Sequence, residues 1–415
     1  MPRVFLGNFD FEHELARYSA DASPAIPAAA ARVRKAFGGP TGSDLSWSWI
    51  AIAAADDVVI APGRILPRGF DALAELGLSI PRFISERRTL DQLQGMTLTP
   101  WGWSASAVAL GALYDWDCPA PPLNVVRKAN SREFQFELER DWHVGLSGAA
   151  QIVALDELAE VVQKQRGSES MWLLKANFGM SGREAIRGRG TKLDNKTGNW
   201  AARRLASGGP IFFEPLVDRV AEAGIQIDIP RDAPPTLVGV TPLLVDRSGT
   251  YRGSRFGCPA SEIEVWQPAV ETALRAAQIL RREGYFGPLG IDAMQYRDDH
   301  GHLRLRPLQD INARYTMGRL ALGFTRILPA GWCGTWIHFG TRHVAGRSID
   351  DLLVEIEGAQ PPHVKLIPAS PRFIGSRPSA HHAVLVLAPS PESRRRAEEA
   401  LFNSLGISVD LPPAM

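Results

Sequence analysis

Apolar and polar residues alternate through residues 287–319, and this pattern predicts two strands joined by a tight turn. The turn falls at residues 298–301, Asp-Asp-His-Gly, because Asp and Gly tolerate turn geometry. Side chains alternate between the two faces of a strand, so Asp310, Asn312 and Arg314 are expected on one face. Two oxygen donors and a guanidinium at this spacing suit a divalent cation and phosphate oxygens. Taken alone, the motif fits an ordinary hairpin with a solvated face as well.

Hydrophobic periodicity places helices and strands along the rest of the chain. Residues 57–61, 70–78 and 78–84 form the pattern strand, helix, strand, which predicts a small α/β layer with parallel strands. A proline-rich segment at 118–122 then predicts a boundary. Further helices are expected at 132–142, 155–164, 199–205, 270–284 and 392–405, and further strands at 171–176, 210–217, 223–229, 236–245 and 381–387.

Composition narrows the class of protein. The chain has 415 residues, 45% hydrophobic and 22% charged, as is ordinary for a globular protein of two or three domains. A net charge of +1 gives no electrostatic case for binding nucleic acid or an acidic membrane surface. The longest apolar runs are too short to span a bilayer. Three well-separated cysteines, Cys118, Cys258 and Cys333, predict no disulfide framework, and we expect a cytoplasmic location.

One lysine, Lys175, stands in the apolar run 171–176, immediately before a glycine-containing loop. The loop has Gly179 and Gly182 and ends at Arg183, but it fits neither of the two common glycine-rich nucleotide motifs. Its glycines would let backbone N–H groups approach a phosphate, and a tight turn without a ligand explains them equally well. The lysine itself is either an ammonium aimed at phosphates or part of a solvated strand face.

Several other polar residues are candidates for ligand binding. Glu214 ends an apolar strand just before a proline, where its carboxylate would accept from an adenine amino group or a ribose hydroxyl. Asp218 and Glu222 follow on an expected turn and are candidates for the ribose. Arg252 and Arg255 are candidates for gripping a substrate carboxylate or an acyl phosphate. An edge-strand acid and surface arginines are the alternative explanations.

The order of these features along the chain resembles the ATP-grasp superfamily over roughly residues 125–320. The resemblance implies an α+β / α/β chain in which two α+β lobes clasp ATP, preceded by a small Rossmann-like α/β domain. It divides the chain into a pre-ATP-grasp domain at 1–124, a central lobe with the glycine loop at 125–206, a C-terminal lobe with the metal-binding hairpin at 207–325, and an extension of unclear role at 326–415.

Carried over residue by residue, the resemblance implies a nucleotide site and a metal site. The expected ATP-binding residues are Arg132, Lys175, Gly179, Ser181, Gly182, Arg183, Glu214, Leu216 and Glu222. The expected Mg²⁺ ligands, with Mn²⁺ as the alternative cation, are Asp292, Asp310 and Asn312. The expected catalytic residues are Arg314 and Lys175, together with Arg255.

The spacing of the two metal-binding aspartates departs from the pattern of the superfamily. A simple two-residue turn would set Asp292 opposite Pro307 instead of Asp310. A bulge at Arg306 and Pro307 would correct the register, because proline within a strand favours an irregularity. Many members also have Glu where this chain has Asp310, so the shorter side chain must bring its strand nearer the metal.

The leading hypothesis is an ADP-forming ligase that joins a small-molecule carboxylate to an amine or thiol through an acyl phosphate. The same ATP site would serve a small-molecule kinase, and a nucleotide-binding module without turnover is the third hypothesis. We expect no nucleic acid or membrane partner, and a homo-oligomer is compatible with the sequence.

Overall fold

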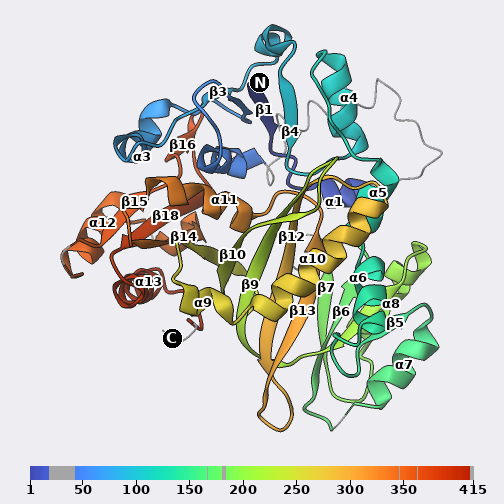
Figure 1. Ribbon diagram of the computed structural model, residues 1–415. Coiled ribbons are helices and arrows are strands. Elements are labelled where there is room, and N and C mark those ends of the chain that lie inside the picture. The colour runs from blue at the N-terminus through green and yellow to red at the C-terminus, as the bar shows by residue number, and fades with distance from the viewer. Residues whose placement is uncertain (18–42, 166, 180–183, 345, 362, 412–415) are drawn as a thin grey trace.

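The chain is described here by a computed structural model that covers residues 1–17, 43–165, 167–179, 184–344, 346–361 and 363–411 (Figure 1). Three main sheets organise it: a four-stranded parallel sheet, a four-stranded antiparallel sheet and an eight-stranded antiparallel sheet. The mixed α/β architecture expected from the sequence is confirmed.

The first domain is built on the parallel sheet, with strand order β3-β2-β1-β4. Apolar side chains fill both faces of these short strands, which is typical of a parallel sheet covered by helices. The helix expected at residues 70–78 is a 3₁₀ turn followed by a short α-helix that ends before Gly77, whose φ of 86° favours glycine. The elements of this domain are β1 (Arg3–Leu6), α1 (Phe11–Leu15), η1 (Ser43–Ala51), β2 (Val58–Ile60), η2 (Pro67–Phe70), α3 (Asp71–Glu75), β3 (Arg82–Ile84), η3 (Arg87–Leu93), β4 (Thr97–Pro100) and α4 (Ala105–Leu113).

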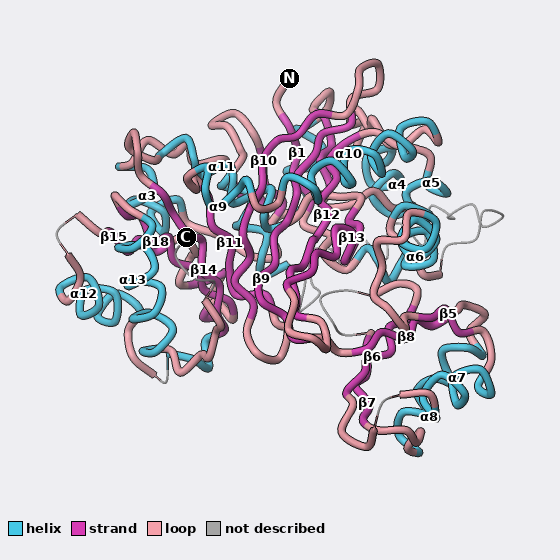
Figure 2. Tube along the Cα trace, turned by 60° about the horizontal axis from the view of Figure 1, so that its bottom comes forward, coloured by secondary structure: helices cyan, strands magenta, loops and turns pink. Residues whose placement is uncertain are grey.

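A small lobe follows, in which helices pack on one antiparallel sheet of order β5-β8-β6-β7. Figure 2 shows this lobe projecting from the rest of the molecule. Its own core contains Trp172, Leu174 and Phe213. The last strand, β8, pairs with β5 and β6, so a division of the chain at residues 206/207 cuts through this sheet. The elements of the lobe are β5 (Ala150–Ile152), α7 (Leu155–Gln163), β6 (Met171–Ala176), β7 (Ala185–Arg189), α8 (Asn195–Ala206) and β8 (Ile211–Pro215). Two helices precede the lobe and pack into the core of the large sheet: α5 (Leu123–Ala129) and α6 (Arg132–Asp141).

The large sheet has the order β13-β12-β9-β10-β11-β14-β18-β15, so residues after 326 complete it instead of forming a separate extension. Helix α10 lies across β9, β12 and β13 (Figure 1), and α12 and α13 cover the end of the sheet at β14, β18 and β15. The elements are β9 (Asp218–Ile229), β10 (Thr236–Val245), β11 (Tyr251–Phe256), α9 (Ala260–Glu264), α10 (Gln267–Arg282), β12 (Gly287–Arg297), β13 (Leu303–Asn312), α11 (Met317–Gly323), η4 (Phe324–Ile327), β14 (Cys333–Gly340), η5 (Thr341–Val344), α12 (Ile349–Gly358), β15 (Lys365–Pro368), β16 (Phe373–Ile374), β17 (Arg377–Pro378), β18 (His381–Ala388) and α13 (Pro391–Ser404).

The hairpin of β12 and β13 has the irregular register that the sequence required. Met294 pairs with Arg306, but Asp292 pairs with Asp310, so one residue on β12 faces three on β13. The extra residues 307–309 form a bulge beginning at the proline, as expected. The bulge therefore sets the two aspartates directly opposite each other.

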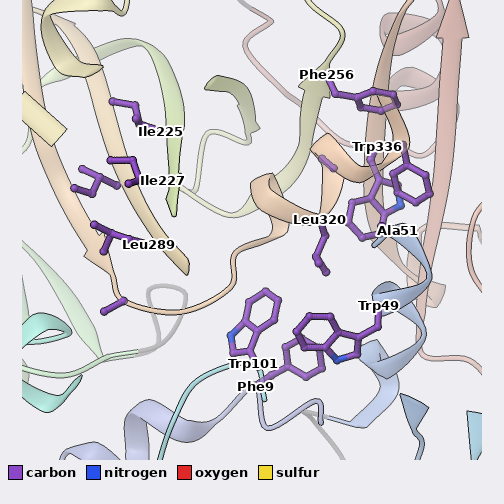
Figure 3. Packing of buried hydrophobic residues seen from close by; sticks show 14 of the residues in the cluster. Phe9, Trp49, Ala51, Trp101, Ile225, Ile227, Phe256, Leu289, Leu320 and Trp336 are labelled. Carbon is purple, nitrogen blue, oxygen red and sulfur yellow. The ribbon is translucent and has the colours of Figure 1, made fainter. Parts of the chain in front are cut away.

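Aromatic side chains join the first domain to the large sheet (Figure 3). The buried ring of Trp49 in η1 lies 4.6 Å from the Phe5 ring and 5.0 Å from the Tyr315 ring, and packs edge-on against Trp101. The Tyr315 N–H donates to the Trp101 carbonyl oxygen at 3.0 Å. These contacts fix the first domain against the segment that directly follows the β12–β13 hairpin.

Within the described ranges, none of the helices combines the length and the apolar character that crossing a bilayer requires.

We expect Trp49→Ala to lower the free energy of unfolding by about 3–5 kcal/mol, because it leaves a large cavity between two layers. Denaturant unfolding followed by circular dichroism measures the change. Trp142→Ala is the matched control, since that ring is half-buried and stacks on the Arg275 guanidinium. An equal loss in both variants would contradict the role given to Trp49.

Candidate active site

The bulged hairpin carries a cluster of oxygen donors at its Asp292–Asp310 pair. The Asn312 side-chain amide lies beside them and donates to Asp292 Oδ2 at 3.4 Å. Its carbonyl oxygen accepts from Arg314 Nη2 at 2.7 Å. The four residues expected at this site from the sequence are therefore adjacent in the structure.

The charge balance of this cluster favours a cation. Burial raises the pKa of Asp292 to about 8, and the neighbouring carboxylates of Asp310 and Glu222 add to the shift. A divalent cation between the aspartates would offset this repulsion. No group of three or more His, Cys, Asp or Glu residues in the described part of the chain could hold a metal. Two carboxylates with one amide instead suit Mg²⁺, which completes its shell with water and phosphate oxygens.

A polar cleft opens beside the hairpin, at the junction of all three sheets. Arg132, in the first turn of α6, reaches Asp310 Oδ1 with Nη1 at 3.2 Å. Ser131 caps that helix by accepting from the Phe134 N–H, which fixes where Arg132 projects. The cleft is lined by Glu12, Asn130, Arg132, Asn177, Gly179, Asp310, Ile311 and Asn312.

Gly179 is the last described residue of the expected glycine loop before a gap. Ser181, Gly182 and Arg183 lie outside the described residues. Gly179 itself lines the cleft, so the loop leaves β6 at the edge of the site.

Lys175 lies on β6 and forms an ion pair with Glu214, its Nζ 2.7 Å from Oε2. Burial lowers the pKa of Lys175, and the charges of Arg132 and Arg306 lower it further, which places these cations close together. Glu214 Oε1 accepts from Arg306 Nη2 at 3.0 Å, and Arg306 also binds Glu139 on α6. Burial alone would raise the pKa of Glu214, but the charges of Arg306 and Lys175 hold it well below its usual value.

These partners differ from those expected for the adenine and ribose positions. Both carboxylate oxygens of Glu214 face cations, and the backbone N–H of Leu216 donates to the Met171 carbonyl oxygen. Glu222 lies within β9 instead of on a turn, and its carboxylate accepts from the Gln309 side chain at 2.8 Å.

Arg255 is not at this site, which corrects the role expected for it. Residues that pair across neighbouring strands have their side chains on the same face of the sheet. The pairs Met294–Glu222, Glu222–Leu243 and Leu243–Ser254 therefore place Ser254 on the same face as Asp292. The next residue, Arg255, therefore points to the opposite face. There it forms a buried ion pair with Glu398 on α13, with Nη2 and Oε2 2.6 Å apart.

The fold brings five residues to the site that were not expected there from the sequence: Glu12, Asn130, Asn177, Glu139 and Arg306. Asn130 and Asn177 adjoin segments that were singled out, and both line the cleft and accept partly buried hydrogen bonds. Glu12 lies 302 positions before its partner Arg314. No local signal in the sequence connects residues so far apart.

Comparison with known proteins identifies the fold of the chain. No family model matches the chain. A curated relative, [butirosin acyl-carrier protein]–L-glutamate ligase from Niallia circulans, is 27% identical over 280 residues, covering 62% of this chain. The chain spans 60% of that relative's length.

Two solved structures match nearly the whole chain. N5-carboxyaminoimidazole synthetase from Staphylococcus aureus, complexed with ADP, has a TM-score of 0.53 at 12% identity, covering 97% of this chain and 96% of its own. The biotin carboxylase domain dimer of Hydrogenobacter thermophilus 2-oxoglutarate carboxylase, solved with MgADP, ADP and bicarbonate, has a TM-score of 0.52 at 11% identity, covering 98% and 90%. The chain therefore has the ATP-grasp fold that the sequence resemblance implied.

We expect Asp292→Asn to stabilise the metal-free protein by a few kcal/mol at pH 8 and not at pH 4. The pKa of Asp292 is about 8 in the folded state, above its usual 3.8, so the folded state holds this proton more tightly. Stability is therefore lost as pH rises from about 4 through 8, and the substitution removes that loss. Denaturant unfolding in EDTA across this pH range measures it.

Asp298→Asn on the same hairpin is the matched control and should show the opposite sign. A hydrogen bond from Arg304 lowers the pKa of Asp298 to about 2, so its stabilisation is present at neutral pH and lost in acid. A pH-independent effect of Asp292→Asn would contradict the charge balance described above.

We expect Arg255→Ala to lower the free energy of unfolding by about 3–5 kcal/mol, because it leaves Glu398 buried without its main cation. ATP affinity, measured by calorimetry, should stay unchanged. Arg247→Ala is the control, since that exposed arginine pairs with Asp410 at the surface and should cost about 1 kcal/mol or less. Loss of ATP affinity without loss of stability would return Arg255 to the site.

Proposed function

We propose that this protein is an ATP-dependent ligase that activates a carboxylate as an acyl phosphate and joins it to an amine or thiol. The observation that carries the proposal is that three cations lie around a pair of opposed aspartates, one of which lines the cleft. Lys175, Arg132 and Arg314 come from three different segments, and each lies within reach of the Asp292–Asp310 pair or of one another.

Asp292, Asp310 and Asn312 are proposed to hold Mg²⁺, with Mn²⁺ as an alternative that accepts the same oxygen ligands. Bound with ATP, the cation would supply positive charge to the phosphate oxygens. Solved structures of similar fold contain ADP or MgADP, which supports a nucleotide as the ligand of this protein. The proposed ATP-binding residues are the nine that the superfamily resemblance implies. We propose that Glu214 and Leu216 border the nucleotide pocket with the backbone at the end of β8, and that the Glu214 carboxylate does not bind the nucleotide.

The reaction we propose has two displacement steps. A carboxylate oxygen of the acid forms a bond to the γ-phosphorus, and the bond from that phosphorus to ADP breaks with its electron pair staying on ADP. Lys175 and Arg314 stabilise the negative charge on the transferring group. The nucleophile then bonds to the acyl carbon, inorganic phosphate leaves with the electron pair, and the nucleophile's proton passes to solvent or phosphate. Closure of the cleft must keep water from the acyl phosphate.

The curated relative also guides the choice of substrates. That relative is named as a ligase of an acyl-carrier protein and L-glutamate. Amino-acid carboxylates are therefore the acids to test first, with small amines, thiols and carrier-bound groups as nucleophiles.

We expect Mg-ATP-dependent ADP release that requires one acid and one nucleophile. Lys175→Ala and Asp310→Asn should each lower kcat/KM by about 10²–10³. The first removes a positive charge that stabilises the transferring phosphoryl group, and the second removes a ligand of the cation that would supply such charge. A coupled ADP assay over pools of acids and amines measures this. Lys192→Ala and Asp232→Asn, both exposed, are the matched controls.

The outcomes separate the three functional classes. A stable phosphorylated product formed without a nucleophile would show that the protein is a small-molecule kinase and not a ligase. ATP binding that Asp310→Asn leaves unchanged, with no turnover from any pool, would leave a nucleotide-binding module.

A further inference from the structure

A buried carboxylate from the first domain reaches into the cleft. Glu12 lies in the first turn of α1, and only 5% of its surface is exposed. Its Oε1 accepts from Arg314 Nε at 2.7 Å. Its Oε2 is fully buried and has no hydrogen-bond donor among the described residues. One oxygen of this carboxylate is therefore paired and the other is not, and Glu12 is one of the residues that line the cleft.

An unpaired carboxylate oxygen in this position can accept hydrogen bonds from a ligand. Burying such an oxygen without a donor costs free energy that a bound donor recovers. The surroundings favour a cationic donor, since Asp310 lies close enough to Glu12 for their charges to interact. An ammonium group has three donors and one positive charge, which suits a small site between two carboxylates.

The guanidinium of Arg314 lies directly beside the Glu12 carboxylate. Its guanidinium donates to Glu12 through Nε, to the Tyr315 carbonyl oxygen through Nη1 and to Asn312 through Nη2. Those bonds use three of its five N–H groups, and the other two can bind a carboxylate next to the proposed metal site. A single molecule that carries an ammonium one carbon away from a carboxylate can therefore touch Glu12 and Arg314 together.

We propose that Glu12 binds the ammonium group of the acid whose carboxylate is activated beside Arg314, so that the acid substrate is an amino acid. This inference rests on the proposed ligase function and names the substrate class of that same site. Glu12 determines specificity and takes no part in the bond-forming steps.

The test uses hydroxylamine, a small nucleophile that converts an acyl phosphate into a hydroxamate and so reports activation alone. Wild-type protein with Mg-ATP is given pairs of acids that differ only in the amino group, such as L-glutamate and glutarate or L-alanine and propionate. The amino acid of the active pair should exceed its partner in kcat/KM by at least about 100-fold, as sites built around a polar substrate group do. N-acetylation of the amino acid should abolish activation.

Glu12→Gln should lower kcat/KM for the amino acid by at least about 30-fold more than it lowers kcat/KM for the deaminated acid, so the preference for the amino group should shrink by that factor. A merely structural role would lower both in proportion, and that result would overturn the proposal. Glu14→Gln is the matched control on the same helix, because Glu14 accepts from the Ser106 N–H outside the cleft. It should leave both activities unchanged.

Two other results would also overturn the inference. Equal use of both acids by the wild-type protein would leave the ligase standing without an ammonium site. Unchanged hydroxamate formation in Glu12→Gln, with slower coupling to an amine, would place the ammonium on the nucleophile.

Absence of turnover from every acid would instead count against the ligase. In that case calorimetric titration of amino acids, in the presence of a non-hydrolysable ATP analogue, still tests Glu12. Equal affinity in wild type and Glu12→Gln would overturn the subsite. Titrating wild-type protein with the paired acids needs no variant to fold, because the difference in affinity within a pair reports the preference for an ammonium group.

Discussion

The site depends on ion pairs that join charged residues of different structural units, most of them shielded from solvent. Arg314 follows the large sheet and binds Glu12 of the first domain, and Arg132 of α6 binds Asp310 of the large sheet. Taking a charge out of water is costly, and the cost is recovered only when an opposite charge lies close by with good geometry. The relative placement of the units is therefore fixed at the point where substrates would meet.

The same requirement explains the chain of charges that runs from α6 into the small lobe. Glu139, Arg306, Glu214 and Lys175 alternate in sign, and each contacts the next at 2.6–3.0 Å. Lys175 is held by Glu214, so a phosphate entering the cleft would compete with a carboxylate for the same ammonium. Arg306 occupies the position before the bulge on β13, which links the geometry of the metal hairpin to the position of Lys175.

A large and continuous sheet supports this arrangement from behind. The last three strands to join it, β14, β18 and β15, come from the part of the sequence that showed no recognisable function. The back face of the large sheet carries its own ionic cluster, in which Arg255 of β11 and Arg394 of α13 bind Glu262 of α9 and Glu398 of α13. An arginine on that face stabilises the packing of α13, whereas an arginine on the front face meets the cleft.

Features set by neighbouring residues were determined by the sequence alone. The β12–β13 hairpin, the bulge beside Pro307 and the spacing of Asp310, Asn312 and Arg314 all follow from alternation, turn chemistry and the geometry of proline. Helices such as α7 and α10 lie within a few residues of their expected positions for the same reason. These are short-range effects, which periodicity reports directly.

Only the tertiary structure decided which distant residues share the cleft and which face of the sheet each strand presents to it. Glu12 meets Arg314 because aromatic packing seats the first domain on the large sheet, and no local pattern encodes that contact. Arg255 was misplaced because a basic residue on a strand looks the same on either face until the cross-strand pairing is known. The β12–β13 hairpin becomes part of a candidate site because charged residues distant in the sequence, Glu12 and Arg132, pair with Arg314 and Asp310.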